Sequence, residues 1–147
     1  MLQDWSHLIE LPWVYLCDSE FVLNGVKFWG SPFTPPFNEW AFNDEDPRRW
    51  DAMPDDVDVL ITHGPPLYIA DTNTSGDHCG SPSLLAWLKG AAANSVHPKA
   101  HFFGHIHECH GQTGSHPCGD FWANVSYVDE DYRPTGKVAT FELALSQ

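Results

Sequence analysis

The stretch FFGHIHECHG, residues 102–111, gathers side chains that bind metal ions. It places three histidines, one glutamate and one cysteine within six consecutive positions, between two glycines. Imidazole, carboxylate and thiolate groups are common ligands of zinc, manganese and iron. The stretch therefore suggests a catalytic metal site, a structural zinc site, or a polar turn that is rich in histidine.

The spacing of His105 and His107 favours a metal site. In an extended loop these two side chains would project to the same side, about 6–7 Å apart. That separation suits one ligand to each of two metal ions lying about 3.5–4 Å apart, as in two-metal phosphate chemistry. Three imidazoles, with His63 as the third, are too few for two ions, so carboxylates or an asparagine would have to complete the set. An isolated histidine in a loop is more often simply solvated.

Two apolar runs predict the strands that position these histidines. The first run, residues 57–62, is rich in β-branched residues and ends at His63, and the second, residues 99–103, ends just before the cluster. Between them, Ser81 as N-cap and Pro82 as the first helical residue predict a helix that ends at about residue 93. A strand–helix–strand unit makes the two strands parallel, and loops at the carboxyl ends of parallel strands build binding sites. We therefore expect His63 to lie near the cluster.

The rest of the chain predicts further strands around this unit. Asn-Gly within residues 21–29 is a strong hairpin signal, and residues 30–38 are too rich in proline for a helix or a central strand. Residues 44–56 suggest a short helix that ends before a proline, and residues 121–127 and 137–145 have the composition of strands. The fold class expected is mixed α/β, with antiparallel pieces flanking a parallel unit, in a single domain over residues 1–147.

Composition excludes some partners. The chain has 20 acidic and 7 basic residues, a net charge of −13, which disfavours nucleic acid and anionic membranes. No apolar run is long enough for a membrane helix and no signal peptide is evident, so we expect a cytoplasmic protein. The 4 cysteines form no C-x-x-C pair and are expected to be reduced thiols. A phosphate substrate would need positive charge from bound metal.

Two motifs resemble those of the calcineurin-like metallophosphoesterases. They are VDVLITHGPP at residues 57–66 and FGHIHE at residues 103–108, and they match the family's H-G-P and G-H-x-H motifs in order. Shorter matches look like the branch called metallophosphoesterase-domain-containing proteins: GSP at 30–32, WAF at 40–42, NVS at 124–126 and YRP at 132–134. The resemblance covers most of residues 13–145.

The resemblance implies a partial αββα sandwich and a metal-dependent, phosphodiesterase-like hydrolase of phosphate esters. By this resemblance His63 and His105 would bind one metal ion and His107 the other, with one or two ions of Mn, Fe or Zn. Gly64 and Gly104 would lie beside the substrate, a small phosphate ester or nucleotide.

The family's earlier motifs have no counterpart before His63. These are D-x-H, G-D, and G-N-H, whose histidine is the general acid, and the G-D-H at residues 76–78 stands in the wrong order. We therefore expect the carboxyl-terminal part of the domain, with impaired activity and no assigned general acid. Such a piece would expose core surface and a sheet edge, which predicts self-association.

Two other functions remain open. One is a non-catalytic nucleotide- or phosphate-binding module that stacks bases on Phe33, Phe37 or Trp40, although aromatics are more often core. The other is a structural zinc protein, although the spacing of its candidate ligands along the sequence matches no standard zinc knuckle. Its ligands would be drawn from Cys109, His110, His116 and Cys118, with one of the motif histidines.

Several other polar residues have simpler interpretations. Asp71, Asp77 and His78 are candidates to orient an imidazole from outside the site, but a solvated loop is the simpler interpretation. His101 and His116 are interpreted as strand or surface residues.

Overall fold

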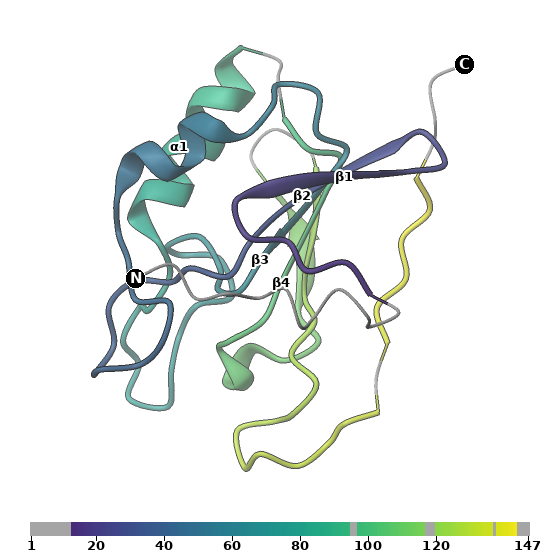
Figure 1. The fold of residues 1–147 in the computed structure, drawn as a ribbon. Coiled ribbons are helices and arrows are strands. Elements are labelled where there is room, and N and C mark those ends of the chain that lie inside the picture. Colours follow the sequence, from purple (N-terminus) through teal and green to yellow (C-terminus); the bar gives the residue numbers. More distant parts are fainter. Residues whose placement is uncertain (1–12, 95–96, 117–119, 137, 144–147) are drawn as a thin grey trace.

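A single mixed sheet forms the centre of the molecule. The computed structural model describes residues 13–94, 97–116, 120–136 and 138–143. Within these ranges six strands pair in the order β1-β2-β3-β4-β6-β5 (Figure 1). The strands are β1 (Ser19–Leu23), β2 (Val26–Ser31), β3 (Val59–Thr62), β4 (Ala100–Phe103), β5 (Thr113–Ser115) and β6 (Phe121–Asn124). The helical elements are η2 (Pro47–Ala52), α1 (Pro82–Ala93) and η3 (His107–Cys109). The mixed α/β fold class is confirmed.

The sheet is parallel in its middle and antiparallel at both edges. Strands β2, β3, β4 and β6 run parallel to their neighbours, while β1 and β5 each pair antiparallel with one of them. The β1–β2 hairpin turns on Asn24 and Gly25, whose φ angles are 50° and 82°. Both values are positive, as a tight two-residue hairpin turn requires, and asparagine and glycine tolerate them best. The predicted hairpin is confirmed.

The unit β3–α1–β4 is the predicted crossover. Its strands pair in parallel, with Val59 opposite Ala100. The helix begins at Pro82, and the Ser81 hydroxyl accepts a hydrogen bond from the Leu84 amide at 3.1 Å. This amide has no partner within the helix itself, and the Ser81 side chain supplies one. This arrangement brings the carboxyl ends of β3 and β4 to one edge of the molecule.

The hydrophobic core lies between one face of the sheet, α1 and η2. It includes Trp29 and Leu60 from the strands, Leu84 and Leu88 from α1, and Trp50 from η2. Trp29 and Trp50 pack with ring centroids 6.0 Å apart. Burial of large aromatic rings contributes much of the stability of a chain of this size.

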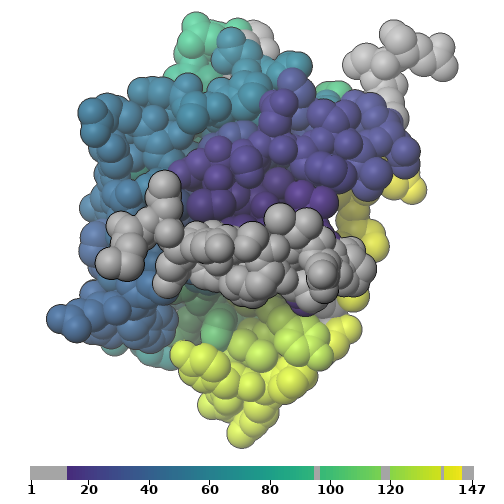
Figure 2. All heavy atoms as spheres, viewed as in Figure 1, coloured from purple at the N-terminus to yellow at the C-terminus, as the bar shows by residue number. Residues whose placement is uncertain are grey.

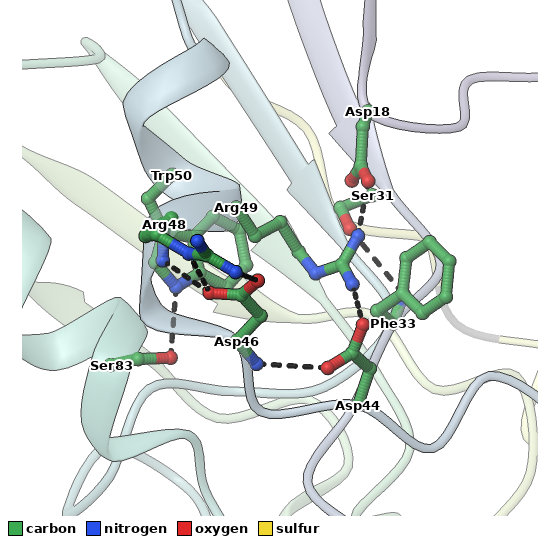
Figure 3. A network of polar contacts seen from close by, with 9 residues as sticks. All are labelled: Asp18, Ser31, Phe33, Asp44, Asp46, Arg48, Arg49, Trp50 and Ser83. Carbon is green, nitrogen blue, oxygen red and sulfur yellow. Dashed lines mark hydrogen bonds and ion pairs between the residues drawn. The ribbon is translucent and has the colours of Figure 1, made fainter.

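A buried arginine fixes the loop that precedes η2 (Figure 3). The Arg49 side chain is 9% exposed, and its guanidinium pairs with the carboxylates of Asp18 and Asp44. It also lies over the Phe33 ring, 3.6 Å from the centroid. A buried arginine is stable only when its charge is paired in this way. The network ties β1 and the proline-rich loop to η2.

One predicted strand is wrong where it can be checked. Residues 138–143 contain no strand, and the other ends of the predicted range, residues 137 and 144–145, lie outside the described residues. The reason is that both edges of β6 are already paired, with β4 and with β5. Phe141 instead stacks its ring on Phe121, with centroids 4.9 Å apart.

The second face of the sheet has no helix over it among the described residues. The exposed fraction of Ile61 is 40%, although β3 is an interior strand, and that of Val125 is 44%. Exposed core surface was expected, whereas self-association stays a prediction. None of the helices within the described ranges has the length and apolar composition needed to cross a membrane.

Candidate functional site

His63 and His105 meet at the carboxyl ends of β3 and β4. The His63 amide donates to Ser31 O at 3.0 Å and its carbonyl accepts from Gly104 N at 2.9 Å, so the two loops are hydrogen-bonded together. The imidazole nitrogens His63 Nε2 and His105 Nδ1 are 3.0 Å apart. The crossover therefore brings these two predicted ligands into contact, as its parallel strands led us to expect.

The segment that carries His107 is not extended, so the predicted geometry is wrong. His105 has a left-handed backbone with φ of 70°, and Ile106 N donates to Gly104 O at 2.8 Å. The tight turn and η3, which begins at His107, break the alternation on which the same-side prediction relied. The His107 ring lies edge-on to Tyr132, with centroids 4.9 Å apart. Among the described residues, no three histidine, cysteine or acidic side chains converge as a metal cluster.

Burial keeps the histidine pair neutral. It lowers the pKa of His63, assisted by the charge of His107. It lowers the pKa of His105 to about 4, assisted by the charges of His63 and His107. Neutral imidazoles offer the lone pairs that a metal ion needs. Two nitrogens bound to one tetrahedral zinc ion lie about 3.3 Å apart, so the observed pair fits an ion after a small shift. His107 would have to move to join them.

A cavity of about 980 Å³ opens beside the histidines. His63, His105 and His107 line it, with the segments 35–45, 73–82 and 126–132 around them. In Figure 2 the blue surface near residues 35–45 and the yellow surface near 125–135 lie on either side of a hollow. This volume is large enough for a small organic ligand.

Aromatic side chains form one wall of this cavity. Phe37 is 52% exposed and Trp40 54% exposed, so the core interpretation is wrong for both. Their ring centroids are 5.1 Å apart, and the Trp40 ring lies 6.4 Å from that of His105. Phe33 behaves differently, because it packs edge-on against Phe42 under the Arg49 guanidinium.

The two motif glycines are closely packed by the protein itself. A Cβ on Gly64 would lie 3.2 Å from Thr34 Oγ1, and one on Gly104 would lie 3.3 Å from Ser126 Oγ. Gly104 lines a smaller cavity of about 390 Å³, which also reaches His63 and His105. The role of these glycines in substrate binding stays a prediction.

A buried carboxylate next to the cavity was not anticipated. Asp71 is 1% exposed, so the solvated-loop interpretation is wrong for it. Its Oδ1 lies 2.7 Å from His78 Nδ1, and its Oδ2 accepts from the amides of Tyr68 and Gly80 at 2.9 and 3.0 Å. His78 lines the same cavity as the motif histidines. The sequence offered Asp71 and His78 as residues that could orient an imidazole, but a solvated loop was the simpler interpretation, and the G-D-H triplet at residues 76–78 contains His78 without Asp71.

A second histidine pair lies inside the core. His101, on β4 as expected, is fully buried, and His116 is 3% exposed, which overturns the surface interpretation for His116. His101 Nε2 lies 2.8 Å from Thr62 Oγ1, and its Nδ1 lies 3.3 Å from His116 Nε2. Because the Thr62 hydroxyl donates to Gly64 O at 2.7 Å, it must accept from His101. The chain of bonds therefore ends at the loop that carries His63.

The alternative zinc ligands have separate partners in the structure. Cys109 Sγ donates to Thr72 O at 3.6 Å, His110 Nδ1 lies 2.6 Å from Ser126 O, and His116 bonds to His101. Cys118 lies outside the described residues. Cys17, Cys79 and Cys109 are free thiols, in line with the expectation of reduced cysteines.

Comparison with known proteins gives curated relatives but no match to a family model. Metallophosphoesterase domain-containing protein 1 of Homo sapiens is 34% identical over 137 residues, which are 88% of this chain and 40% of the relative. A UPF0046 protein of Caenorhabditis elegans is 38% identical over 104 residues, which are 68% of this chain and 25% of the relative. The mouse counterpart of the human protein gives the same 34% identity and coverage. The chain thus spans about 40% of the length of the first of these relatives.

Proposed function

We infer that this chain, which belongs to the metallophosphoesterase-domain-containing protein family, is a metal-dependent hydrolase of small phosphodiesters. The observation that carries the proposal is the neutral pair His63 and His105, whose nitrogens meet 3.0 Å apart beside the cavity. His107 lines the same cavity and would be the third metal ligand.

The charge around the cavity supports a bound divalent ion. No lysine or arginine stands among the described residues that line the cavity, whereas Glu45, Glu108 and Glu130 do. A phosphate group would meet net negative charge there unless a cation were bound. An ion of Mn, Fe or Zn would supply that charge and lower the pKa of a water molecule. His63 Nε2 and His105 Nδ1 would hold it.

The lining also suggests the type of ester. A diester carries one negative charge and a monoester up to two, so the three glutamates disfavour the monoester more strongly. The exposed rings of Phe37 and Trp40 offer a stacking surface for a flat group on the ester. A nucleotide diester or an aryl diester combines both features.

Hydrolysis of bis(p-nitrophenyl) phosphate with added Mn²⁺, Zn²⁺ or Fe²⁺ tests the proposal. We expect slow turnover, because D-x-H, G-D and G-N-H have no counterpart before His63 in this sequence. His105→Ala should reduce it by at least about 100-fold, because losing even an outer-shell partner of a metal ligand costs about 10- to 100-fold. His97→Ala is the matched control, because His97 does not line the cavity. No turnover with any ion, or equal losses in both variants, would contradict the proposal.

A second function is a non-catalytic binding module for nucleotides. The exposed aromatic wall of Phe37 and Trp40 favours it, because stacking needs no metal chemistry. Binding of a nucleoside monophosphate without turnover, weakened by Trp40→Ala, would select this function over hydrolysis.

A further inference from the structure

The hydrogen bonds of Asp71 fix which nitrogen of His78 carries the proton of the neutral ring. A carboxylate can only accept, so the His78 Nδ1 that lies 2.7 Å from Asp71 Oδ1 must carry a proton. Asp71 is itself held, because its Oδ2 accepts from the Tyr68 and Gly80 amides. No other hydrogen bond to His78 is formed by the described residues. The side chain is 46% exposed, which leaves its Nε2 available to a ligand.

The segment that carries this pair is a small hairpin with internal bonds. Asn73 Oδ1 accepts from the amides of Ser75 and Asp77, both at 2.9 Å. Asn73 N donates to Asp77 O at 3.0 Å, and Cys79 N donates to Asp71 O at 2.9 Å. The hairpin of residues 71–79 is therefore a defined support for His78.

The base of this hairpin is bound to the loop that follows His63. Ser81 N donates to Pro65 O at 2.9 Å, and Leu67 N donates to Ser81 O at 3.0 Å. A Cβ on Gly80 would lie 2.5 Å from Pro66 O, so glycine is what lets the two backbones approach this closely.

The far end of the hairpin is bound to the segment that follows His107. Thr74 N donates to Glu108 Oε1 at 3.1 Å, and Cys109 Sγ donates to Thr72 O at 3.6 Å. His78 is thus held between the two loops that carry the motif histidines, and it lines their cavity.

We propose that His78, oriented by Asp71, donates the proton to the leaving group during phosphodiester hydrolysis at this site. This rests on the proposed function. The oxygen of water bonds to phosphorus while the bond from phosphorus to the leaving oxygen breaks. The electron pair of that bond stays on the leaving oxygen, which takes the proton from Nε2 of the doubly protonated His78. The attacking water loses one proton to solvent, and solvent reprotonates Nε2. Asp71 is a positioning residue that keeps Nδ1–H in place.

A leaving-group comparison with His78→Asn tests this role. Asparagine can still donate to Asp71 but has no group at the position of Nε2, so the support is kept and the acid is lost. The substrates are ethyl phenyl phosphate and ethyl p-nitrophenyl phosphate, each with the metal ion that activates the wild type. Phenolate is a poor leaving group that needs protonation, whereas p-nitrophenolate leaves without it.

We expect kcat of His78→Asn to fall about 100-fold on the phenyl ester and less than about 3-fold on the p-nitrophenyl ester, with KM unchanged. Asp71→Asn should show the same selectivity with a smaller loss. Equal losses on both esters would overturn the role of His78 while leaving the hydrolase standing. Absence of wild-type turnover on both esters would instead overturn the proposed function, and the proton transfer with it.

A measurement without turnover gives an independent readout. Long-range ¹H–¹⁵N NMR of the chain loaded with diamagnetic Zn²⁺ should show that the neutral form of His78 carries its proton on Nδ1, and its Nε2 signal should shift when inorganic phosphate is added. Asp71→Asn should abolish the tautomer preference. A proton on Nε2 in the wild type, or an Nε2 signal unchanged by phosphate, would overturn the proposal.

Discussion

Acidification should destabilise the fold through the buried pair His101 and His116. Burial lowers the pKa of His101 well below its usual value, and the charge of His116 adds to the effect. Burial also lowers the pKa of His116 to about 4, although the charge of Asp120 opposes the shift. Both rings are therefore neutral in the folded chain at pH 5, whereas an unfolded histidine, with a pKa of about 6.5, is mostly charged there.

The sign and size of the effect follow from proton binding. Below pH 6.5 the unfolded chain binds more protons than the folded one, so stability falls as pH falls from about 6.5 toward 4. For His116, a shift from 6.5 to about 4 corresponds to about 2 kcal/mol lost at pH 5. The Arg48 side chain lowers the pKa of Asp46 to about 2. Protonation of Asp46 therefore reduces the stability of the fold only in more acidic solution.

Urea unfolding in EDTA, followed by tryptophan fluorescence at pH 7.5 and pH 5.0, measures the loss. His116→Gln keeps a donor for His101 Nδ1 but does not titrate, so its loss between the two pH values should be about 2 kcal/mol smaller than that of the wild type. His78→Gln, at a 46% exposed side chain that pairs with Asp71 and not with Asp120, is the control. If the free energy of unfolding falls equally between pH 7.5 and pH 5.0 in the wild type and in His116→Gln, the reasoning is refuted.

Three other outcomes follow from the packing. Gly80→Ala should destabilise the fold by about 1–3 kcal/mol, because the new Cβ would lie 2.5 Å from Pro66 O; a midpoint in urea equal to that of the wild type would contradict this. Arg49→Met should cost about 2 kcal/mol by leaving two carboxylates without their partner, measured by the same unfolding assay, with exposed Arg48→Met as control. Trp40→Ala should weaken binding of an aryl phosphodiester by about 3- to 10-fold while leaving inorganic phosphate binding unchanged, measured by calorimetry.

The elements predicted well are those whose signals are local. Asn24-Gly25 allows few turns other than the hairpin observed, and Ser81-Pro82 marks the helix start to the residue. The parallel pairing of β3 and β4 followed from the helix between them. That pairing is also what brought His63 and His105 together, so this part of the candidate site was predictable.

The parts missed depend on contacts between distant segments. The composition of residues 137–145 suits a strand, but β5 already occupies the edge of β6. The left-handed backbone of His105 cannot be read from G-H-I-H, which suggested an extended loop. Asp71 and His78 are brought to the cavity by bonds between the hairpin and two loops, and no short motif encodes those bonds.

The central claim is that His63 and His105 together hold a divalent metal ion. The most direct test is elemental analysis of the chain after loading with Mn²⁺ or Zn²⁺ and removal of free ions, for the wild type, His63→Ala, His105→Ala and Cys109→Ser. The account predicts one or two ions per chain in the wild type and in Cys109→Ser, and loss of metal in either histidine variant. Metal retained in both histidine variants, or lost only in Cys109→Ser, would contradict it.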